Sequence, residues 1–582
     1  MLYLDARVES PELLSSKAEE ILFRIHQRMD KYMSEQQRRQ DNLRVRPEGL
    51  KTLWDAADVC SVPALMYQVS QSPNINIDAI NPETGQSPLH YAARHEDGLN
   101  FVSCLLRLNA TVDLVCSEGR TALYFAAAHG YADIARQLLA SGANPNAFTK
   151  DGMSPLLIAA QNGHLDVIRV LGEYGVNLLS TNNEGESALY KACEIGSEDI
   201  VQYFVQHDID VNGTTRSQMS DLLVACVKGH LNIVKQLLAN GARLTDRNLR
   251  GASCLYLAAQ NGHMDVIRTL ADAERKALAD FSTDPTPVPD SDAKAVGGLT
   301  AARPSPLVEE ADREGWTPLI IACWNGDVDV VKGLVEELGA DIHARALDGT
   351  TALYVAVQRG NTNVFKLLLE KDAEYAARSR SEDSALSSSA NKPTRIPLVN
   401  QEQKNGWTPL MVASLFGCLE IVQVAVRDYN ADIATKSING TTALYFAAQA
   451  GHINIVRFLI DNACATEEDR RRMVNQTRRN AWTPLMIAAG NNHPDVVRCL
   501  VDEYGADLLL QNSSGQSALF VAVQWLDAGG LAFMIDRETD LRMQTSPELA
   551  HDRKQAQQLV VNQPDPSPAG KVLGLAHPHQ RS

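Results

Sequence analysis

The chain has 582 residues, of which 45% are hydrophobic, and a formal net charge of −17. This length predicts more than one domain, and the acidic balance argues against a surface that binds nucleic acid or acidic lipid along its whole length. No apolar run approaches the roughly 18 residues that a membrane-spanning helix needs, and the first residues do not resemble a secretory signal. We therefore expect an intracellular protein, in the cytoplasm or also in the nucleus, without membrane insertion.

The first 49 residues precede any repeated pattern and predict one helix. Ser10 followed by Pro11 is typical of a helix start. Apolar side chains follow at intervals of four and three residues, at Ala18, Leu22, Ile25, Met29 and Tyr32. Two heptads are fewer than a coiled coil needs. Packing of this extension, residues 1–49, onto the first repeat and dimerisation through it therefore both stay open.

The chain is internally repetitive from about residue 50 to residue 536. Each unit carries a leucine within a Thr-Pro-Leu, Ala-Leu-Tyr or similar sequence, and units that no insertion separates are 33 or 34 residues apart. These anchor leucines are Leu89, Leu123, Leu156, Leu189, Leu222, Leu255, Leu319, Leu353, Leu410, Leu444, Leu485 and Leu519. A weaker copy around Leu53 brings the number of units to thirteen. A fixed period of this length indicates a solenoid whose units stack on their neighbours.

The unit at residues 119–146 illustrates why each copy predicts two short helices. Thr121 is a typical helix N-cap. Leu123 begins a small apolar stripe, and Gly130 breaks the helix before a second apolar pattern follows. Neither helix has enough apolar surface to fold alone, so the units must bury their apolar faces against one another.

These units resemble the ankyrin repeat. SPLHYAA at residues 87–93 is close to that family's first-helix motif, and GHLDVIRVL at residues 163–171 matches its second-helix signature. The resemblance implies an all-α solenoid of helix-turn-helix units with β-hairpin or turn fingers between them. We expect a first array at 50–275 and a second at 314–536. The unit that contains Gln218 departs from the pattern, because it lacks both the turn glycine and the proline.

Cysteines and histidines recur at fixed positions of the repeat, which argues against a metal site. Four residues after an anchor leucine, where other units have alanine, serine or valine, stand Cys193, Cys226 and Cys323. We expect buried, inert thiols there. Eight residues after an anchor stand His164, His230, His263, His452 and His493. Such residues repeat along a stack instead of converging, so we expect backbone hydrogen bonds at the turn between helices, and no metal or cofactor.

A pentapeptide, GWTPL or AWTPL, opens three units and supplies Trp316, Trp407 and Trp482. In one interpretation each tryptophan packs on the apolar residue five positions later, as a hydrophobic staple at a helix start. In the other, the three tryptophans also line a concave groove and bind a partner protein, since tryptophan is enriched at binding hot spots. Both can hold. The recurrence itself is explained by tandem duplication of a two-unit block.

Three insertions precede these three units and should project from the same side of the stack. Residues 276–313 form a proline-rich segment that we expect to be flexible, and 375–405 are rich in serine. The stretch 465–480 has five arginines. The serine-rich stretch is either a phosphorylation site or a passive linker, and the arginine-rich stretch either a nuclear-import or acidic-partner patch or a solvated helix. In the tail, 537–582, we expect a short helix from Ser546 and disorder after about Asn562.

No sequence motif of a known catalytic site is present, and a stack of similar units offers an extended surface rather than a pocket of convergent groups. We therefore expect a protein that is not an enzyme. The resemblance implies a scaffold or adaptor that binds one or more partner proteins along the concave groove. Two alternatives stay open: a non-catalytic subunit of an enzyme complex, and a nuclear regulator that uses the basic insertion 465–480.

Overall fold

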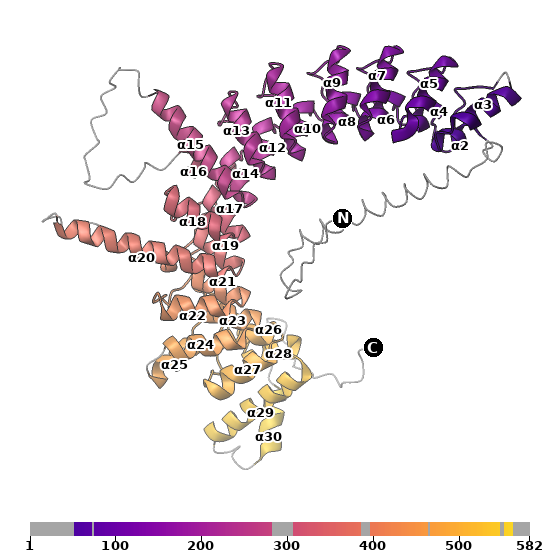
Figure 1. Cartoon of the computed structure of the whole chain (residues 1–582). Coiled ribbons are helices and arrows are strands. Elements are labelled where there is room, and N and C mark those ends of the chain that lie inside the picture. Colours follow the sequence, from indigo (N-terminus) through magenta and orange to yellow (C-terminus); the bar gives the residue numbers. More distant parts are fainter. Residues whose placement is uncertain are drawn as a thin grey trace, which may run out of the picture. The chain divides into compact units, whose positions relative to one another are not determined.

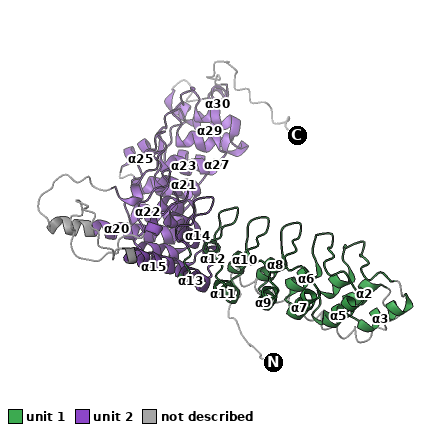
Figure 2. Ribbon diagram, turned by 90° about the horizontal axis from the view of Figure 1, so that it is seen from above, with its two compact units in different colours: residues 1–224, 239–242 green, residues 225–238, 243–582 purple. Residues whose placement is uncertain are grey.

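The computed structural model describes residues 52–72, 75–281, 306–385, 396–463, 466–546 and 552–562, with the backbone alone at 280–281 and 378–385. The predicted N-terminal helix and the tail after residue 562 lie outside these residues. The chain forms two compact units, which are described one at a time (Figure 2). Unit 1 is residues 1–224 with 239–242, and unit 2 is residues 225–238 with 243–582.

Unit 1 is a stack of helix pairs. Its helices are α2 (Leu53–Asp58), α3 (Val62–Gln71), α4 (Pro88–Ala92), the 3-10 turn η3 (Glu96–Gly98), α5 (Leu99–Arg107), α6 (Ala122–His129), α7 (Ala132–Ala140), α8 (Pro155–Gln161), α9 (Leu165–Glu173), α10 (Ala188–Ile195) and α11 (Glu198–Gln206). The first helices pack in the order α2, α4, α6, α8, α10, and the second helices α3, α5, α7, α9 follow beside them (Figure 1). The division between the units falls within α12 (Asp221–Lys228), which precedes α13 (Leu231–Ala239).

Unit 2 repeats the same arrangement. Its helices are α14 (Cys254–Gln260), α15 (Met264–Phe281), α16 (Pro306–Glu309), α17 (Pro318–Asn325), α18 (Val328–Lys332), η4 (Gly333–Glu337), α19 (Ala352–Gln358), α20 (Thr362–Ala385), η5 (Leu398–Asn400), α21 (Pro409–Phe416), α22 (Leu419–Arg427), α23 (Ala443–Ala450), α24 (Ile453–Ala463), α25 (Glu467–Val474), α26 (Pro484–Gly490), α27 (Pro494–Arg498), η6 (Cys499–Glu503), α28 (Ala518–Trp525), α29 (Ala528–Thr545) and α30 (Arg553–Val561). The first helices α14, α17, α19, α21, α23, α26 and α28 each pack on the next. All thirteen leucines of the predicted register are at most 5% exposed, which confirms the all-α repeat fold.

Stacking continues across the longest insertion. Helix α14 packs directly on α17, although the sequence assigned these two helices to different arrays, and the short α16 packs against both of them and against α15. Helices α15 and α20 extend to Phe281 and Ala385, so each insertion starts later than the sequence suggested. The starts predicted at residues 276 and 375 were wrong because polar helix continuations were assigned to loops.

The C-terminal helices also differ from the prediction. Helix α29 runs through residue 536, where the second array was expected to end, and Ser546 is its C-terminal cap instead of the start of a new helix. The last helix begins at Arg553, after Asp552, whose carboxylate accepts a hydrogen bond from the backbone N–H of Gln555. Helices α29 and α30 pack against each other, so both belong to the folded stack.

A single extra residue explains why some units are 34 residues long. In the units of Leu319 and Leu485 the second helix ends in a π-helical turn, η4 or η6. There the N–H of Ala340 donates to the carbonyl of Leu334, six residues back, at 2.9 Å. In the 33-residue unit of Leu123 the corresponding hydrogen bond spans five residues. The π turn therefore absorbs the insertion without disturbing the stack.

Turns between the units form the predicted fingers, with single antiparallel bridges such as Thr181 with Ser187 and Arg345 with Thr351. Each finger needs one residue at positive φ, and Gly315 and Gly406 supply it at 82° and 74°. Ala481 takes the same position at 60°, which an L-residue with a side chain adopts only at a cost. In the degraded unit, Gln218 likewise stands at 58° in place of glycine.

Candidate protein-binding surface

The three tryptophans stand where the finger meets the first helix. Thr317, Thr408 and Thr483 each accept a hydrogen bond from the backbone N–H three residues on, and proline occupies the first helical position. The capping that was predicted for these pentapeptides is thus present. All three indoles are half-buried, so each leaves part of its surface toward solvent.

Trp316 lines a surface pocket of about 740 Å³ within unit 2. The pocket lies between two successive fingers and the first helices α14 and α17, and Ile321, five residues after Trp316, lines it as well. Trp324 completes an aromatic wall, since its ring meets that of Trp316 edge to face with 5.6 Å between centroids. The pocket therefore offers an apolar wall beneath a polar rim, as a hot-spot pocket does.

Charged groups and a buried phenol surround this pocket. The carboxylate of Asp312 accepts hydrogen bonds from the backbone N–H groups of Glu314 and Trp316, at 3.0 and 2.9 Å, and so fixes the finger. Burial, with Asp312 beside it, raises the pKa of Tyr256, so this phenol stays protonated at neutral pH. The Arg359 guanidinium lies over the ring of Trp324, 4.8 Å from the ring centroid.

The other two tryptophans make different contacts. Trp407 reaches the following repeat, where its ring lies 4.5 Å, centroid to centroid, from that of Phe446. Trp482 lies against α26, since a Cβ added at Gly490 would be 3.5 Å from its ring. The tryptophans thus share a register, but they stand in alternate units and do not converge on one pocket. Partner binding by them stays a prediction.

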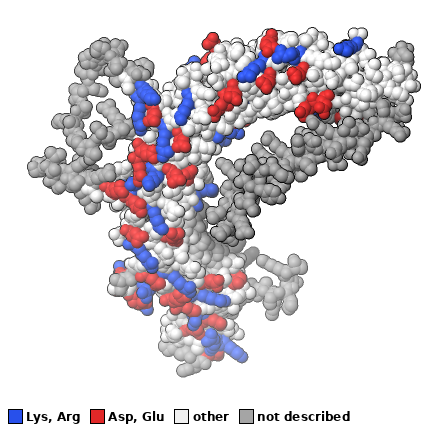
Figure 3. Space-filling model, in the orientation of Figure 1, with Lys and Arg blue, Asp and Glu red and all other residues white. Residues whose placement is uncertain are grey.

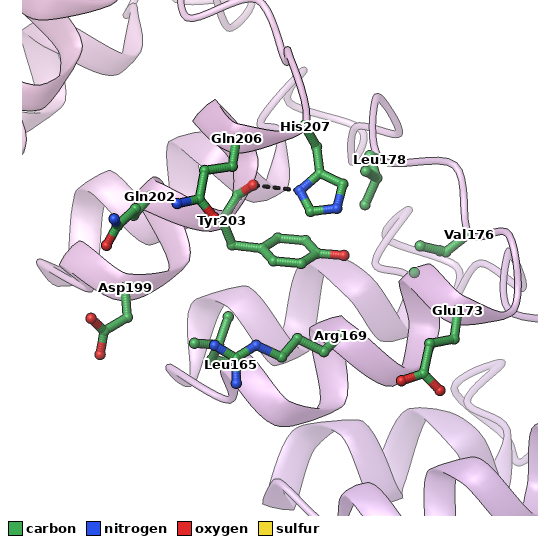
Figure 4. A pocket seen from close by; sticks show the side chains of 11 residues that line it. Leu165, Arg169, Glu173, Val176, Leu178, Asp199, Gln202, Tyr203, Gln206 and His207 are labelled. Carbon is green, nitrogen blue, oxygen red and sulfur yellow. Dashed lines mark hydrogen bonds between the residues drawn. The ribbon is translucent and has the colours of Figure 1, made fainter.

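Another surface pocket, of about 990 Å³, lies in unit 1 between the second helices α9 and α11 (Figure 4). The Tyr203 side chain extends from α11 toward α9, and its hydroxyl occupies the space of the missing side chain of Gly172. His207 packs on Tyr203 with 4.1 Å between ring centroids. This pocket was not predicted from the sequence, although one signal was available: the other regular repeats have Leu, Val, Ala or Ile where this repeat has Gly172.

The cysteines and histidines fulfil their predicted structural roles. Cys193, Cys226 and Cys323 are fully buried, and burial raises the pKa of each thiol far above its ordinary value. Four of the five histidines place Nε2 within 3.0–3.2 Å of a backbone carbonyl of the preceding unit; these are His164, His263, His452 and His493. Among the described residues, no three potential ligands cluster as a metal site would require.

The way in which the chain returns to the stack after each insertion was also not predicted from the sequence. A buried valine stands eight residues before each tryptophan of the three pentapeptides, at Val308, Val399 and Val474. The following side chain then accepts a hydrogen bond from a backbone N–H of the next unit. These pairs are Glu309 with Asp341, Asn400 with Asp432, and Asn475 with Asp507, at 2.8–2.9 Å. The recurring Leu/Met-Val-Glu/Asn sequence was the available signal.

The arginine-rich insertion contains helix α25. Arg470 pairs with Glu467 at 3.2 Å, and Arg472 with Glu468 at 3.5 Å. These contacts are those of the solvated helix considered from the sequence. Met473 and Val474 at its end are buried, so the helix is tied to the repeats at its C-terminus.

The chain belongs to the ankyrin-repeat family. The model of that family, which spans three ankyrin repeats, matches residues 53–149, 147–215, 222–346, 297–379, 339–424, 375–471 and 465–545. Over the described residues, no helix combines the length and the hydropathy that crossing a membrane requires.

Three curated relatives each match about a quarter to a third of this chain. The chain is 29% identical over 196 residues to the human transient receptor potential cation channel subfamily A member 1, covering 31% of this chain and 17% of the channel. It is 29% identical over 208 residues to a probable E3 ubiquitin-protein ligase XBOS32 from rice, covering 32% of this chain and 37% of the ligase. It is 31% identical over 160 residues to the probable 26S proteasome regulatory subunit p28 of Saccharomyces cerevisiae, covering 23% of this chain and 70% of p28.

Proposed function

We propose that this protein is a non-catalytic scaffold that binds a partner protein along the fingers and first helices of unit 2. The observation that carries the proposal is the pocket at Trp316, where two aromatic rings form a wall between successive fingers. Ankyrin repeats are in general protein-binding modules. Buried aromatic anchors surrounded by polar groups are what such modules use to hold a partner.

Affinity capture followed by reconstitution tests this function. The full chain is used to capture proteins from a lysate of the cells that make it, and each candidate is then purified and mixed with the chain. Light scattering after size exclusion should show a complex of defined stoichiometry. Trp316→Ala should weaken that complex at least tenfold, while thermal melting shows that the variant is still folded at the temperature of the binding assay. Tyr174→Ala, at a half-exposed position in unit 1, should leave it unchanged. If no purified candidate forms a complex, or if both variants behave alike, the proposal is wrong.

A second candidate is a subunit of a larger enzyme complex. The similarity to p28, a probable regulatory subunit of the 26S proteasome, favours it because the match covers 70% of p28. In that case the captured partners should be subunits of one assembly, and they should co-migrate with this chain at the size of that assembly. The nuclear-regulator alternative has less support, because the α25 arginines pair with carboxylates of their own helix.

A further inference from the structure

The residue at the tip of each finger stands six positions before the anchor leucine, and we call it the fingertip residue. In unit 2 the fingertip residues are, in order, Leu249, Arg313, Leu347, Lys404, Ile438, Arg479 and Ser513. Apolar and basic side chains therefore alternate over six successive fingers. In unit 1 the corresponding residues are all polar: Glu83, Ser117, Lys150, Asn183 and Arg216. The alternation is a property of unit 2.

The apolar fingertip residues are strongly exposed. Leu249, Leu347 and Ile438 are 48%, 68% and 54% accessible to solvent. One such residue would need no explanation, since isolated apolar side chains are common on surfaces. Three that recur at every second finger, with a cation between each two, form a regular pattern. An exposed apolar series of this kind is typical of a surface that another chain covers.

The basic fingertip residues lack acidic partners. Within the described part of the chain, no carboxylate oxygen lies within 4.0 Å of the charged nitrogens of Arg313, Lys404 or Arg479. Lys404 instead donates to the backbone carbonyl of Leu347 in the preceding finger. Asparagine or serine follows the fingertip residue in the last four fingers, whereas Glu314 follows Arg313, so the cationic character is stronger toward the C-terminus.

On the second helices of unit 2, in contrast, cations are paired with carboxylates. There Arg268 pairs with Glu337 at 2.8 Å, and Lys366 pairs with Glu420 at 3.0 Å. The cations of one repeat are thus compensated by carboxylates of the next repeat. Figure 3 shows this mixture of signs on the face in view. In a chain of net charge −17, three uncompensated cations in one register indicate an anionic partner.

The backbone of the fingers is already occupied. Five backbone hydrogen bonds of 2.9–3.2 Å link successive fingers of unit 2; they run from Arg313 to Arg250, Leu347 to Glu314, Ile438 to Asn405, Arg479 to Asn439 and Ser513 to Asn480. A partner peptide therefore cannot join as an additional strand along this row. It must be recognised through the fingertip side chains.

The spacing of the fingers limits the conformation of such a peptide. Stacked helices lie about 8–10 Å apart, so successive fingertip residues should be separated by about that distance. A polyproline II helix has three residues per turn and rises about 9.3 Å per turn, so every third side chain faces the same way at this pitch. Side chains three residues apart on a β-strand point to opposite faces.

We propose that the fingertip residues of unit 2 bind an extended acidic segment of a partner protein in the polyproline II conformation, with apolar and carboxylate side chains alternating at every third position. The proposal deepens the scaffold function and rests on it. Carboxylates would meet Arg313, Lys404 and Arg479, and apolar side chains would lie on the leucines and isoleucine between them. The carboxylate at Lys404 replaces the hydrogen bond to the Leu347 carbonyl.

Fluorescence anisotropy with the full chain and labelled 16-residue peptides tests this proposal. The matched peptide carries leucine and glutamate alternately at every third position, with prolines and serines between. One control peptide has the same composition with these residues two positions apart, and another has lysine in place of glutamate. The matched peptide should bind at least tenfold more tightly than either control, and its affinity should fall as salt rises.

Charge reversal in the protein gives the matching test. The combined variant Arg313→Glu, Lys404→Glu and Arg479→Glu should lose the matched peptide at least tenfold and gain the lysine peptide. Lys150→Glu with Arg216→Glu, at fingertips of unit 1, is the control and should change neither affinity. Melting temperatures verify that all variants fold. Equal binding of the matched peptide and the control peptide with two-residue spacing, or no reversal of preference, overturns the proposal. The complex tested by Trp316→Ala decides the scaffold function separately.

Discussion

Trp407 joins two repeats: its ring lies 4.5 Å, centroid to centroid, from that of Phe446 in the following unit. A tryptophan expected on the binding surface is thus also part of the interface between two successive repeats. Trp407→Ala should therefore lower the free energy of unfolding by about 2 kcal/mol, because an aromatic pair contributes about 0.5–1.5 kcal/mol beyond the apolar area it buries.

Thermal unfolding measures this effect. Trp525→Ala is the control, since Trp525 is 63% exposed and its loss should change stability by no more than about 0.5 kcal/mol. If Trp407→Ala melts like the Trp525 variant, the contact with Phe446 contributes nothing to stability.

Leu189 anchors the middle of unit 1 and is almost fully buried. Leu189→Ala should cost about 2–5 kcal/mol, because the shorter side chain leaves a cavity between helices. Leu179→Ala, in the exposed loop before the repeat that contains Leu189, is the matched control. Hydrogen exchange should show faster exchange centred on α8 and α10, which pack on each other. A melt unchanged within one degree would falsify the register of the repeats.

Ala481 occupies the finger position where Gly315 and Gly406 have positive φ. Ala481→Gly should stabilise the protein by about 0.5–1 kcal/mol, since relief of about 1–2 kcal/mol of backbone strain exceeds the entropy that glycine loses on folding. Gly406→Ala should do the opposite, because its Cβ would also stand 2.8 Å from the backbone nitrogen of Ile438. Chemical denaturation of both variants checks the signs, and a less stable Ala481→Gly protein contradicts the argument.

Glu274 is buried where the chain returns from the first insertion, and its carboxylate accepts a hydrogen bond from the N–H of Leu307 at 3.1 Å. Burial, assisted by the nearby Glu310, raises its pKa above the ordinary 4.5. Folding then favours the protonated acid, so this group stabilises the protein most below pH 4.5 and loses that contribution as pH rises through the raised pKa.

Glu274→Gln keeps the acceptor and removes the titration. The variant should melt higher than wild type at pH 7.5, and the difference should shrink as pH falls toward 4.5. Lys276→Gln, on an exposed residue of the same helix that does not act on the Glu274 carboxyl, should show no such convergence. A difference in melting temperature that stays constant with pH would show that Glu274 does not titrate as its burial requires.

The sequence predicted those features that repeat. The anchor leucines, the threonine or serine before each first helix and the buried cysteines follow from spacing alone, because every repeat packs on its neighbours in the same way. The π turn at Gly333–Glu337 could not be predicted, since one extra residue can be absorbed in a finger, a loop or a helix. Only the hydrogen bond from Ala340 to Leu334 reveals where it is placed.

Insertions were predicted less well, and the reason is physical. Residues 375–385 are polar and were assigned to a loop, yet they continue α20 from a buried stretch that includes Leu368 and Leu369. A helix already nucleated by packing extends into sequence that would not form a helix alone. For the candidate surface, the sequence identified Trp316 but not Trp324. Trp324 matters because its ring contacts the ring of Trp316, and this contact is visible only in the folded structure.

The buried valines Val308, Val399 and Val474 fix both where each insertion ends and where the solenoid resumes. Whatever lies between the end of a second helix and such a valine is therefore released from any constraint of length. A segment of different length or composition can therefore be inserted at each of these three places while the repeats on either side keep their stacking distance. The solenoid can thus gain new surface segments without any change in the packing of its core.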